Sequence, residues 1–308
     1  MALLNEVRSN CAKIAAQARS VRIDDAAVGA LAADPALASG TSLPPATLDP
    51  ESHYLEGEAA DVADYLLALD AINFGSGWFG LLRKRSEHGR TLSGYFTVAW
   101  ALADHVRAHG PPTAAWLRDL DTREIAAILG QPADLELMSL YAQALRELGR
   151  FLGDRRALDL VAECGGSAER LAEALAGRSA TAGMAMFEDR GFYKRAQIVA
   201  SDLALAGVAQ FADLDRLTIF ADNLVPHVLR CEGVLVYDDA LAAHIDAGEV
   251  LALGGPEREI RACALHACEL VSQRTSIPPR LLDVWLWNRG QAPEYKARPR
   301  HRCRTVFY

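Results

Sequence analysis

The chain has 308 residues, of which 51% are hydrophobic, and a formal net charge of −8 at pH 7. A chain of this length and composition can bury a substantial core, as one large domain or as two. Its acidic balance repels a phosphate backbone, which argues against a long nucleic acid as partner. A small anionic ligand in a local basic pocket remains compatible with it.

Six cysteines occur without any CxxC pair, at positions 11, 164, 231, 263, 268 and 303. Cys263, His266 and Cys268 lie close together, but their spacing matches no recognised zinc site. We therefore expect free thiols, no metal and a cytoplasmic location. Charged residues interrupt the first apolar stretch, and no uncharged apolar run reaches about 18 residues, so neither a secretory signal nor a membrane span is expected.

Strong helix formers dominate the sequence, and alternating strand patterns are scarce. Asp121 supplies a helix N-cap, and glycines mark several helix ends. Residues 234–237 and 305–308 are the candidates for short extended pieces. The predicted helices cover residues 4–19, 60–73, 91–109, 122–129, 135–152, 155–164, 168–177, 192–207, 214–222, 225–231, 239–247, 257–272 and 279–288.

Two stretches read as connections. Residues 34–50 are rich in Pro, Ala, Ser and Thr and predict an extended link between the first helices and the body. Residues 290–299 form a second loop before the C-terminal segment. No internal repeat of fixed period is visible, which argues against a solenoid. We expect one compact helical domain over residues 1–308.

Residues 192–198 read FYKRAQI and place charges within an apolar helical pattern. Apolar residues recur there at three- and four-residue steps, which predicts one core-facing stripe. Lys194 sits beside that stripe. Arg195 and Asp202 lie seven residues apart on one face and predict a structural brace. A buried charge is costly unless it is paired or has a function.

Residues 217–226 read LTIFADNLVP and carry the second buried charge. Pro226 disfavours helix at the residue before it, so a helix that begins near Asp213 or Asp215 should end around Asp222. Asp222 would then lie in a break between two helices, a common place for reactive side chains. From spacing alone, a structural Lys194–Asp222 ion pair is the favoured interpretation.

These two segments resemble the queuosine salvage protein family, the queuosine 5'-phosphate N-glycosylase/hydrolases. The family's FYKRAQI motif is intact at residues 192–198. Its LTMFADYRVPQ motif corresponds to residues 217–227. Four positions in the second motif differ, with Ile219 for Met, Asn223 and Leu224 for the Tyr-Arg pair, and His227 for Gln.

Three further segments resemble the family in the same order along the chain. Residues 69–79 are similar to its LDALNF segment, residues 257–262 to its E-x-EIRA stretch, and residues 301–308 to its HRTR-x-x-YY ending. The likeness therefore runs from about residue 70 to the last residue. Several motifs in order are far more specific than any one short motif.

The resemblance implies an all-α fold similar to helix-hairpin-helix DNA glycosylases. It also implies hydrolysis of queuosine 5'-monophosphate to queuine and ribose 5-phosphate, which feeds queuine to tRNA modification. The implied partner is this small-molecule substrate, without metal, organic cofactor, long nucleic acid or membrane.

The implied chemistry passes through an oxocarbenium-like transition state, which a carboxylate stabilises directly or by orienting water. By motif position Asp222 is the catalytic candidate, with Lys194 to bind the 5'-phosphate or keep Asp222 ionised. Queuine is a 7-deazaguanine, which has carbon in place of N7, so the enzyme cannot assist its departure by protonating N7. The substrate thus implies donors and acceptors around the guanine-like edge of the leaving base.

Further substrate-binding candidates come from the segments that resemble the family. Phe74 has the ring to stack on a base, and two glycines close behind it allow a near backbone approach. His53 follows the Pro-rich connection, and a segment packed over a pocket mouth would place it on the substrate. Tyr308 ends a tail expected to dock on the body. For each, a purely structural role is the alternative. The candidates are His53, Asp70, Asn73, Phe74, Tyr193, Phe220, Asp283 and Tyr308.

Two other functions stay open from the sequence. One is a glycosylase for another nucleoside or for DNA, although the chain lacks the basic stripe that DNA binding requires. The other is a helical protein that binds queuine or a nucleotide without turnover. Activity of the purified protein separates the binding protein from an enzyme, because a binding protein releases no free base.

Overall fold

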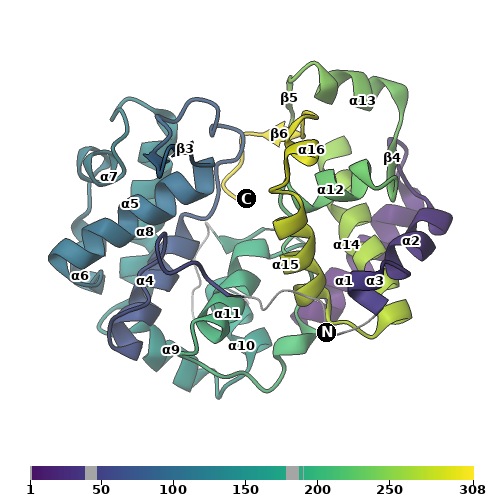
Figure 1. The fold of residues 1–308 in the computed structure, drawn as a ribbon. Coiled ribbons are helices and arrows are strands. Elements are labelled where there is room, and N and C mark those ends of the chain that lie inside the picture. The colour runs from purple at the N-terminus through teal and green to yellow at the C-terminus, as the bar shows by residue number, and fades with distance from the viewer. Residues whose placement is uncertain (1, 39–46, 178–186, 190) are drawn as a thin grey trace.

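A computed structural model describes residues 2–38, 47–177, 187–189 and 191–308. Nearly all of its regular structure is helical, which confirms the predicted all-α class (Figure 1). Within these residues, no helix is both long and apolar enough to span a bilayer. Part of the Pro-rich connection, including its central Pro-Pro pair, lies outside the described residues.

The helices follow one another along the whole chain. The first half contains α1 (Leu3–Gln17), α2 (Asp25–Ala32), α3 (Pro35–Ala38), α4 (Ala59–Ala71), α5 (Gly94–His109), α6 (Ala114–Asp119), α7 (Thr122–Ile128) and α8 (Glu136–Leu152). The second half contains α9 (Ala157–Glu163), α10 (Ala168–Leu175), α11 (Lys194–Leu205), η2 (Leu214–Arg216), α12 (Val225–Cys231), α13 (Asp239–Asp246), α14 (Pro256–Thr275), α15 (Pro279–Arg289) and α16 (Pro293–Lys296).

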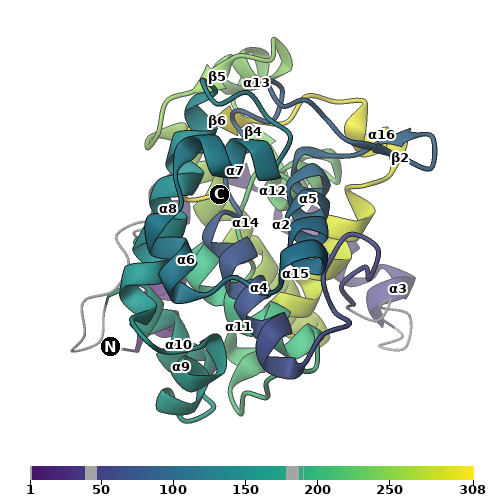
Figure 2. The same ribbon diagram turned by 90° about the vertical axis from the view of Figure 1, so that its left-hand side faces the viewer.

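Two groups of helices face each other across the molecule. Figure 1 shows α4 to α9 on its left and α1, α2 and α12 to α16 on its right, with α11 low between them and the C-terminus in the middle. Figure 2 looks onto the first group, with α15 of the second group behind α5. α11 packs against α4 and α10, while α14 packs against α1 and α2. This arrangement places α11 and the C-terminal tail where the two groups meet.

Three short strand pairs complete the fold. β1 (Val21–Ile23) pairs antiparallel with β4 (Leu235–Tyr237), and β2 (Ser86–Glu87) pairs antiparallel with β3 (Arg90–Thr91). β5 (Val250–Leu251) pairs in parallel with β6 (Arg302–Cys303). The extended piece expected at 234–237 is therefore confirmed. The one expected at 305–308 is wrong, because the strand of the tail lies earlier, at β6.

Most predicted helices are found with ends shifted by a few residues. Asp121 caps α7, since its carboxylate accepts from the backbone N–H groups of Arg123 and Glu124. α5 begins later than predicted because the Ser93 side chain caps it. The sequence interpretation missed the short helices α2, α3, α6 and α16. α3 lies inside the connection that was expected to be extended.

The predicted helix 214–222 is wrong. Only one 3₁₀ turn, η2, forms there, and the chain then runs extended to the start of α12. Distant side chains take over the backbone groups of this segment. The N–H of Thr218 donates to Gln197 Oε1 at 3.0 Å, and the N–H of Phe220 donates to Asp283 Oδ1 at 2.8 Å. These partners replace the helical hydrogen bonds.

The predicted brace between Arg195 and Asp202 is also wrong. The Arg195 guanidinium donates to the Ala71 carbonyl at 2.6 Å and lies over the rings of Phe74 and Phe187, each 4.8 Å from the ring centroid. Arg195 therefore joins α11 to the end of α4, a structural role different from the one predicted.

The C-terminal tail docks on the body, as predicted. Tyr308 is buried, and its carbonyl accepts from the N–H of Gly75 at 2.9 Å. A Cβ atom on Gly77 would lie 2.3 Å from the carbonyl oxygen of Cys303. The glycine at this position therefore permits a close approach of the tail, rather than of a ligand as the sequence interpretation had it.

Candidate active site

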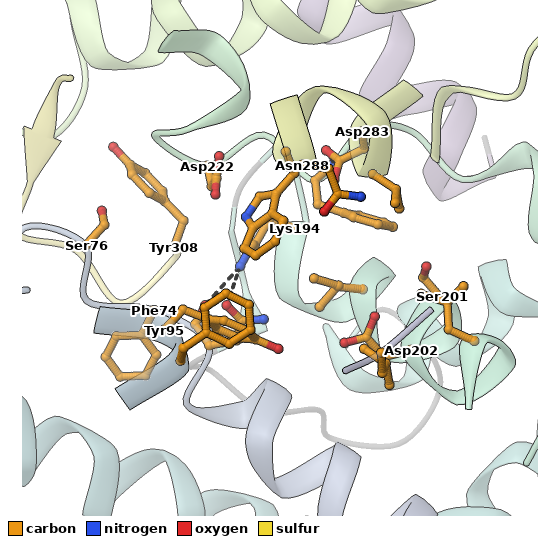
Figure 3. Close-up of a pocket in the computed structure, with 18 of the residues that line it drawn as sticks. Phe74, Ser76, Tyr95, Lys194, Ser201, Asp202, Asp222, Asp283, Asn288 and Tyr308 are labelled. Atoms are coloured by element: carbon orange, nitrogen blue, oxygen red, sulfur yellow. Dashed lines mark hydrogen bonds between the residues drawn. The ribbon is translucent and has the colours of Figure 1, made fainter. Parts of the chain in front are cut away.

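A cavity of about 240 Å³ lies where α5, α11, α15, the extended segment before α12 and the C-terminal tail meet (Figure 3). Most of its charged side chains come from α11, α15 and the extended segment. It brings together eight of the ten predicted site residues, namely His53, Asn73, Phe74, Lys194, Phe220, Asp222, Asp283 and Tyr308.

Asp222 is held at the start of α12, not between two helices. Its Oδ1 accepts from the backbone N–H of Leu224 at 2.7 Å and of Val225 at 3.1 Å. Figure 3 shows the carboxylate pointing into the cavity beside Tyr308. The two N–H donors fix one oxygen, and Oδ2 has no hydrogen-bond partner within the described part of the chain. That oxygen is thus available to a ligand.

Lys194 enters the cavity from the first turn of α11. Its ammonium donates to the carbonyl of Asn73 at 3.0 Å and to Asn73 Oδ1 at 2.9 Å, the dashed lines in Figure 3. Burial lowers the pKa of Lys194, whereas the charges of Asp222 and Asp70 oppose that shift. A direct ion pair with Asp222, the structural alternative, is not among the contacts of the described residues. The third N–H of the ammonium remains for a ligand.

Asp283 lies on α15 and is buried in the cavity wall. Burial, reinforced by the nearby charges of Asp222 and Asp202, raises its pKa to about 8 against the opposing effects of Lys194 and of the Phe220 N–H. The site therefore holds two carboxyl groups in different environments, Asp222 with fixed N–H donors and Asp283 in an apolar wall. Such pairs divide acid and base roles in many hydrolases.

Two phenylalanine rings predicted to contact substrate line the cavity, Phe74 and Phe220. Phe74 packs edge-on against Tyr141, with ring centroids 5.0 Å apart, and the Tyr141 hydroxyl donates to the Phe74 carbonyl. Because Arg195 also covers this ring, Phe74 serves the scaffold as well as the cavity wall.

His53 lies beside the cavity in the segment after the Pro-rich connection. Its Nε2 bonds to the Tyr95 hydroxyl at 2.8 Å and its Nδ1 to the Asp49 carbonyl at 2.8 Å. Burial lowers the pKa of His53, so the neutral ring is favoured. The second bond requires the proton on Nδ1, which leaves Nε2 to accept from Tyr95. His53 thus orients a tyrosine that the sequence interpretation missed.

Two predicted site residues, Asp70 and Tyr193, do not line the cavity. Asp70 is fully buried at the end of α4, behind Asp202. Tyr193 directly precedes α11 and has a positive φ of 50°. This strained backbone turns the chain so that Lys194, the next residue, enters the cavity.

Several cavity residues were not predicted, among them Tyr95, Phe96, Ser201, Asp202 and Trp287. For two of them, the spacing along a helix could have indicated the position. Trp287 lies four residues after Asp283 on α15, and Asp202 lies eight residues after Lys194 on α11, which puts each pair on one helix face. Tyr95 and Phe96 carry no such signal, because a helix with aromatic residues reads as ordinary core.

The departures from the family motif fall mostly on the scaffold. Leu224 is buried and packs against Gly290, the residue that follows α15. His227 Nε2 bonds to the Tyr295 carbonyl at 2.8 Å. Only Asn223 lines the cavity, and its amide donates to the His301 carbonyl at 3.3 Å. The other three, Ile219, Leu224 and His227, do not line the cavity of this chain.

No group of three or more His, Cys, Asp or Glu side chains within the described ranges is arranged to hold a metal ion. All six cysteines are free. The side chains that line the cavity include carboxyl, ammonium, amide, phenol, imidazole and hydroxyl groups.

These features define a class: a helical protein with a cavity in which the carboxyl groups of Asp222 and the buried Asp283 accompany a lysine. The family model described as "Queuosine salvage protein" matches residues 52–308. The chain therefore belongs to the queuosine salvage protein family, as its motifs predicted.

Relatives extend this likeness over nearly the full chain. The chain is 35% identical to the queuosine 5'-phosphate N-glycosylase/hydrolase of Sphaerobacter thermophilus, over 96% of this chain and 95% of that protein. It is 28% identical to the protein of the same name from Bos taurus, over 98% of both chains. The corresponding Mus musculus protein is also 28% identical, over 83% of this chain and 85% of its own length.

Proposed function

We propose that this protein hydrolyses the N-glycosidic bond of queuosine 5'-monophosphate and releases queuine for tRNA modification. The observation that carries the proposal is the Asp222 carboxylate, fixed through one oxygen and open to the cavity through the other, in a chain 35% identical to a named queuosine 5'-phosphate N-glycosylase/hydrolase. Negative charge held beside the anomeric carbon stabilises the oxocarbenium-like transition state.

The mechanism assigns different roles to the two carboxyl groups. Asp222 stabilises the sugar cation or orients the attacking water. Asp283, protonated at neutral pH, donates its proton to the departing deazaguanine, which lacks the N7 that purine nucleosides offer. Environments that separate two carboxyl groups in this way support one acid role and one charge-stabilising role.

Cationic groups near Asp222 support an anionic substrate. The Lys194 ammonium has one N–H left after its two bonds to Asn73. The charge of Asp222 also acts on Arg300 in the tail and counters the lowering of its pKa by burial. Lys194 can bind the 5'-phosphate as a point charge, or keep Asp222 ionised before substrate enters.

Purified protein is expected to release queuine faster from queuosine 5'-monophosphate than from queuosine, because only the monophosphate offers a partner to these cations. Chromatography of both reactions at equal substrate concentration measures the ratio. Equal rates would contradict a phosphate site. Absence of free base from both substrates would favour the alternative of a binding protein without turnover.

The rate is expected to fall as pH rises through about 8, because Asp283 then loses the proton that it donates. In Asp283→Asn the rate is lower, and this alkaline limb disappears since an amide does not titrate in that range. The pH dependence of kcat for both proteins tests this. Lys194 also faces the cavity, so an alkaline limb that persists unchanged in Asp283→Asn would assign it to Lys194 instead.

Three finer expectations belong to the same proposal. The fold is expected to resemble helix-hairpin-helix DNA glycosylases, on the family resemblance. The acidic chain is expected to act on a small molecule and not on long nucleic acid. A cytoplasmic location is expected because its six cysteines are unpaired.

A further inference from the structure

The cavity has a second acidic end, away from the proposed catalytic carboxylate. Figure 3 shows Asp222 and Tyr308 on one side of the Lys194 ammonium and Ser201 and Asp202 on the other. Asp202 is only 6% exposed and lines the cavity from α11. The hydrolysis described above makes no use of this carboxyl group.

Asp202 forms a carboxyl pair with Asp70. The charge of Asp70 acts on Asp202 across α4 and α11, and Asp70 Oδ2 has no hydrogen-bond partner within the described residues. Asp70 Oδ1 accepts from the Asn73 amide at 3.4 Å. Two buried carboxylates that act on each other repel, so the pair favours binding one proton. Burial accordingly raises the pKa of Asp70 to about 7 and, together with Asp70, raises the pKa of Asp202 well above its ordinary value.

Among the described residues, no cationic side chain forms a hydrogen bond or an ion pair with either carboxyl group, although the charges of Lys194 and Arg195 act on Asp70. The Lys194 ammonium donates to Asn73, and the Arg195 guanidinium donates to the Ala71 carbonyl and lies over two phenylalanine rings. With one proton on the two carboxyl groups, the pair carries a single negative charge in a buried wall. Such a charge is costly unless something that enters the cavity neutralises it.

Aromatic rings surround the same end of the cavity. Trp287 of α15 packs at 6.1 Å from Tyr95 and 5.7 Å from Phe96, between ring centroids, and all three line the cavity. Tyr95 lines the same cavity as Asp202, and the charges of Asp202 and Asp70 add to burial in raising the pKa of Tyr95. Aromatic faces beside a carboxylate are the surroundings that bind organic ammonium groups.

We propose that Asp202, supported by Asp70, binds the cationic amine on the side arm of the base and so selects queuine over an unsubstituted deazaguanine. This inference rests on the proposed function, because queuine carries a secondary amine on the methylene group at position 7. One ammonium then faces one negative charge shared by two carboxyl groups. Tyr95 and Trp287 supply the aromatic surface around it.

The test is calorimetric binding of three bases to wild-type protein and to Asp202→Asn. Queuine carries the whole arm, 7-aminomethyl-7-deazaguanine carries only an amine, and 7-deazaguanine has no arm. Asp202→Asn is expected to weaken the binding of both amines about tenfold or more and that of 7-deazaguanine less than about twofold. Equal weakening of all three would overturn the inference, because Asp202 would then contact the ring itself, and no weakening would overturn it as well.

Two further variants serve as controls for this experiment. Asp70→Asn still offers an N–H to an ionised Asp202, so it should retain the preference for amines, and loss of that preference would count against the assigned role. The exposed Asp134→Asn serves as a control for the chemical change. Binding needs no turnover, so an Asp202-dependent preference without release of base would refute the proposed hydrolysis and leave this inference standing.

Discussion

Asp222→Asn is expected to lower single-turnover hydrolysis by about a hundredfold or more, the loss typical when one electrostatic partner of a transition state is removed. Asparagine retains an oxygen for the N–H groups of Leu224 and Val225, so the start of α12 should persist. It removes the negative charge that the sugar cation needs. Substrate should still bind, since the opposite end of the cavity is untouched.

The control is Asp134→Asn, an identical change at an exposed loop position. It should leave rate and melting temperature at wild-type values. Both quantities are measured on one preparation of each variant. A marked fall in the melting temperature of Asp222→Asn, with retained activity in the folded fraction, would mean that Asp222 is only structural and would contradict the proposed mechanism.

The sequence could identify Asp222 and Lys194 but not the backbone that holds them. The likeness of the two motifs to the family identified both residues as catalytic candidates, and both line one cavity in the structure. Pattern alone predicted a helix through residue 222, because LTIFAD is apolar at suitable spacing. The extended segment depends instead on Gln197 and Asp283, which lie 21 and 63 residues away from the groups that they bond. Local propensity contains no information on such distant partners.

The same limit explains the missed end of the cavity. Asp202 was interpreted as the partner of Arg195, because opposite charges seven residues apart share a helix face. The structure pairs Asp202 with Asp70 from another helix, and turns Arg195 toward Ala71. A pair of like charges is not what spacing predicts, since it is unfavourable without a proton between them. Both errors arise where a function is proposed, a common place for local rules to fail.

Arg261→Met is expected to destabilise the protein by about 3–5 kcal/mol and to lower its melting temperature by roughly 10 °C. Arg261 is a fully buried residue of α14 whose guanidinium forms a bidentate pair with the buried Asp189, with Nη1 to Oδ1 at 3.0 Å. Its Nε donates to the Ala221 carbonyl at 2.9 Å, next to Asp222. Methionine fills similar space but leaves Asp189 charged, buried and without this partner.

Two matched variants isolate the cause. Arg274→Met makes the same change at the exposed end of α14, where Arg274 pairs with the exposed Asp25, and should cost less than about 1 kcal/mol. Arg261→Met combined with Asp189→Leu should recover part of the lost stability, because Asp189 is then no longer a buried charge without its partner, while the buried Glu257, 3.7 Å from Arg261 Nη1, still loses its own. Denaturant unfolding of the four proteins measures these differences.

Activity then separates the scaffold from the site. Because Arg261 also anchors the carbonyl before Asp222 and lies 4.6 Å from the centroid of the Tyr308 ring, the double variant should regain part of its stability without regaining the full rate. Equal losses from Arg261→Met and Arg274→Met would contradict the role of the buried pair. A double variant that restored both stability and rate would show that the hydrogen bond to Ala221 does not position Asp222.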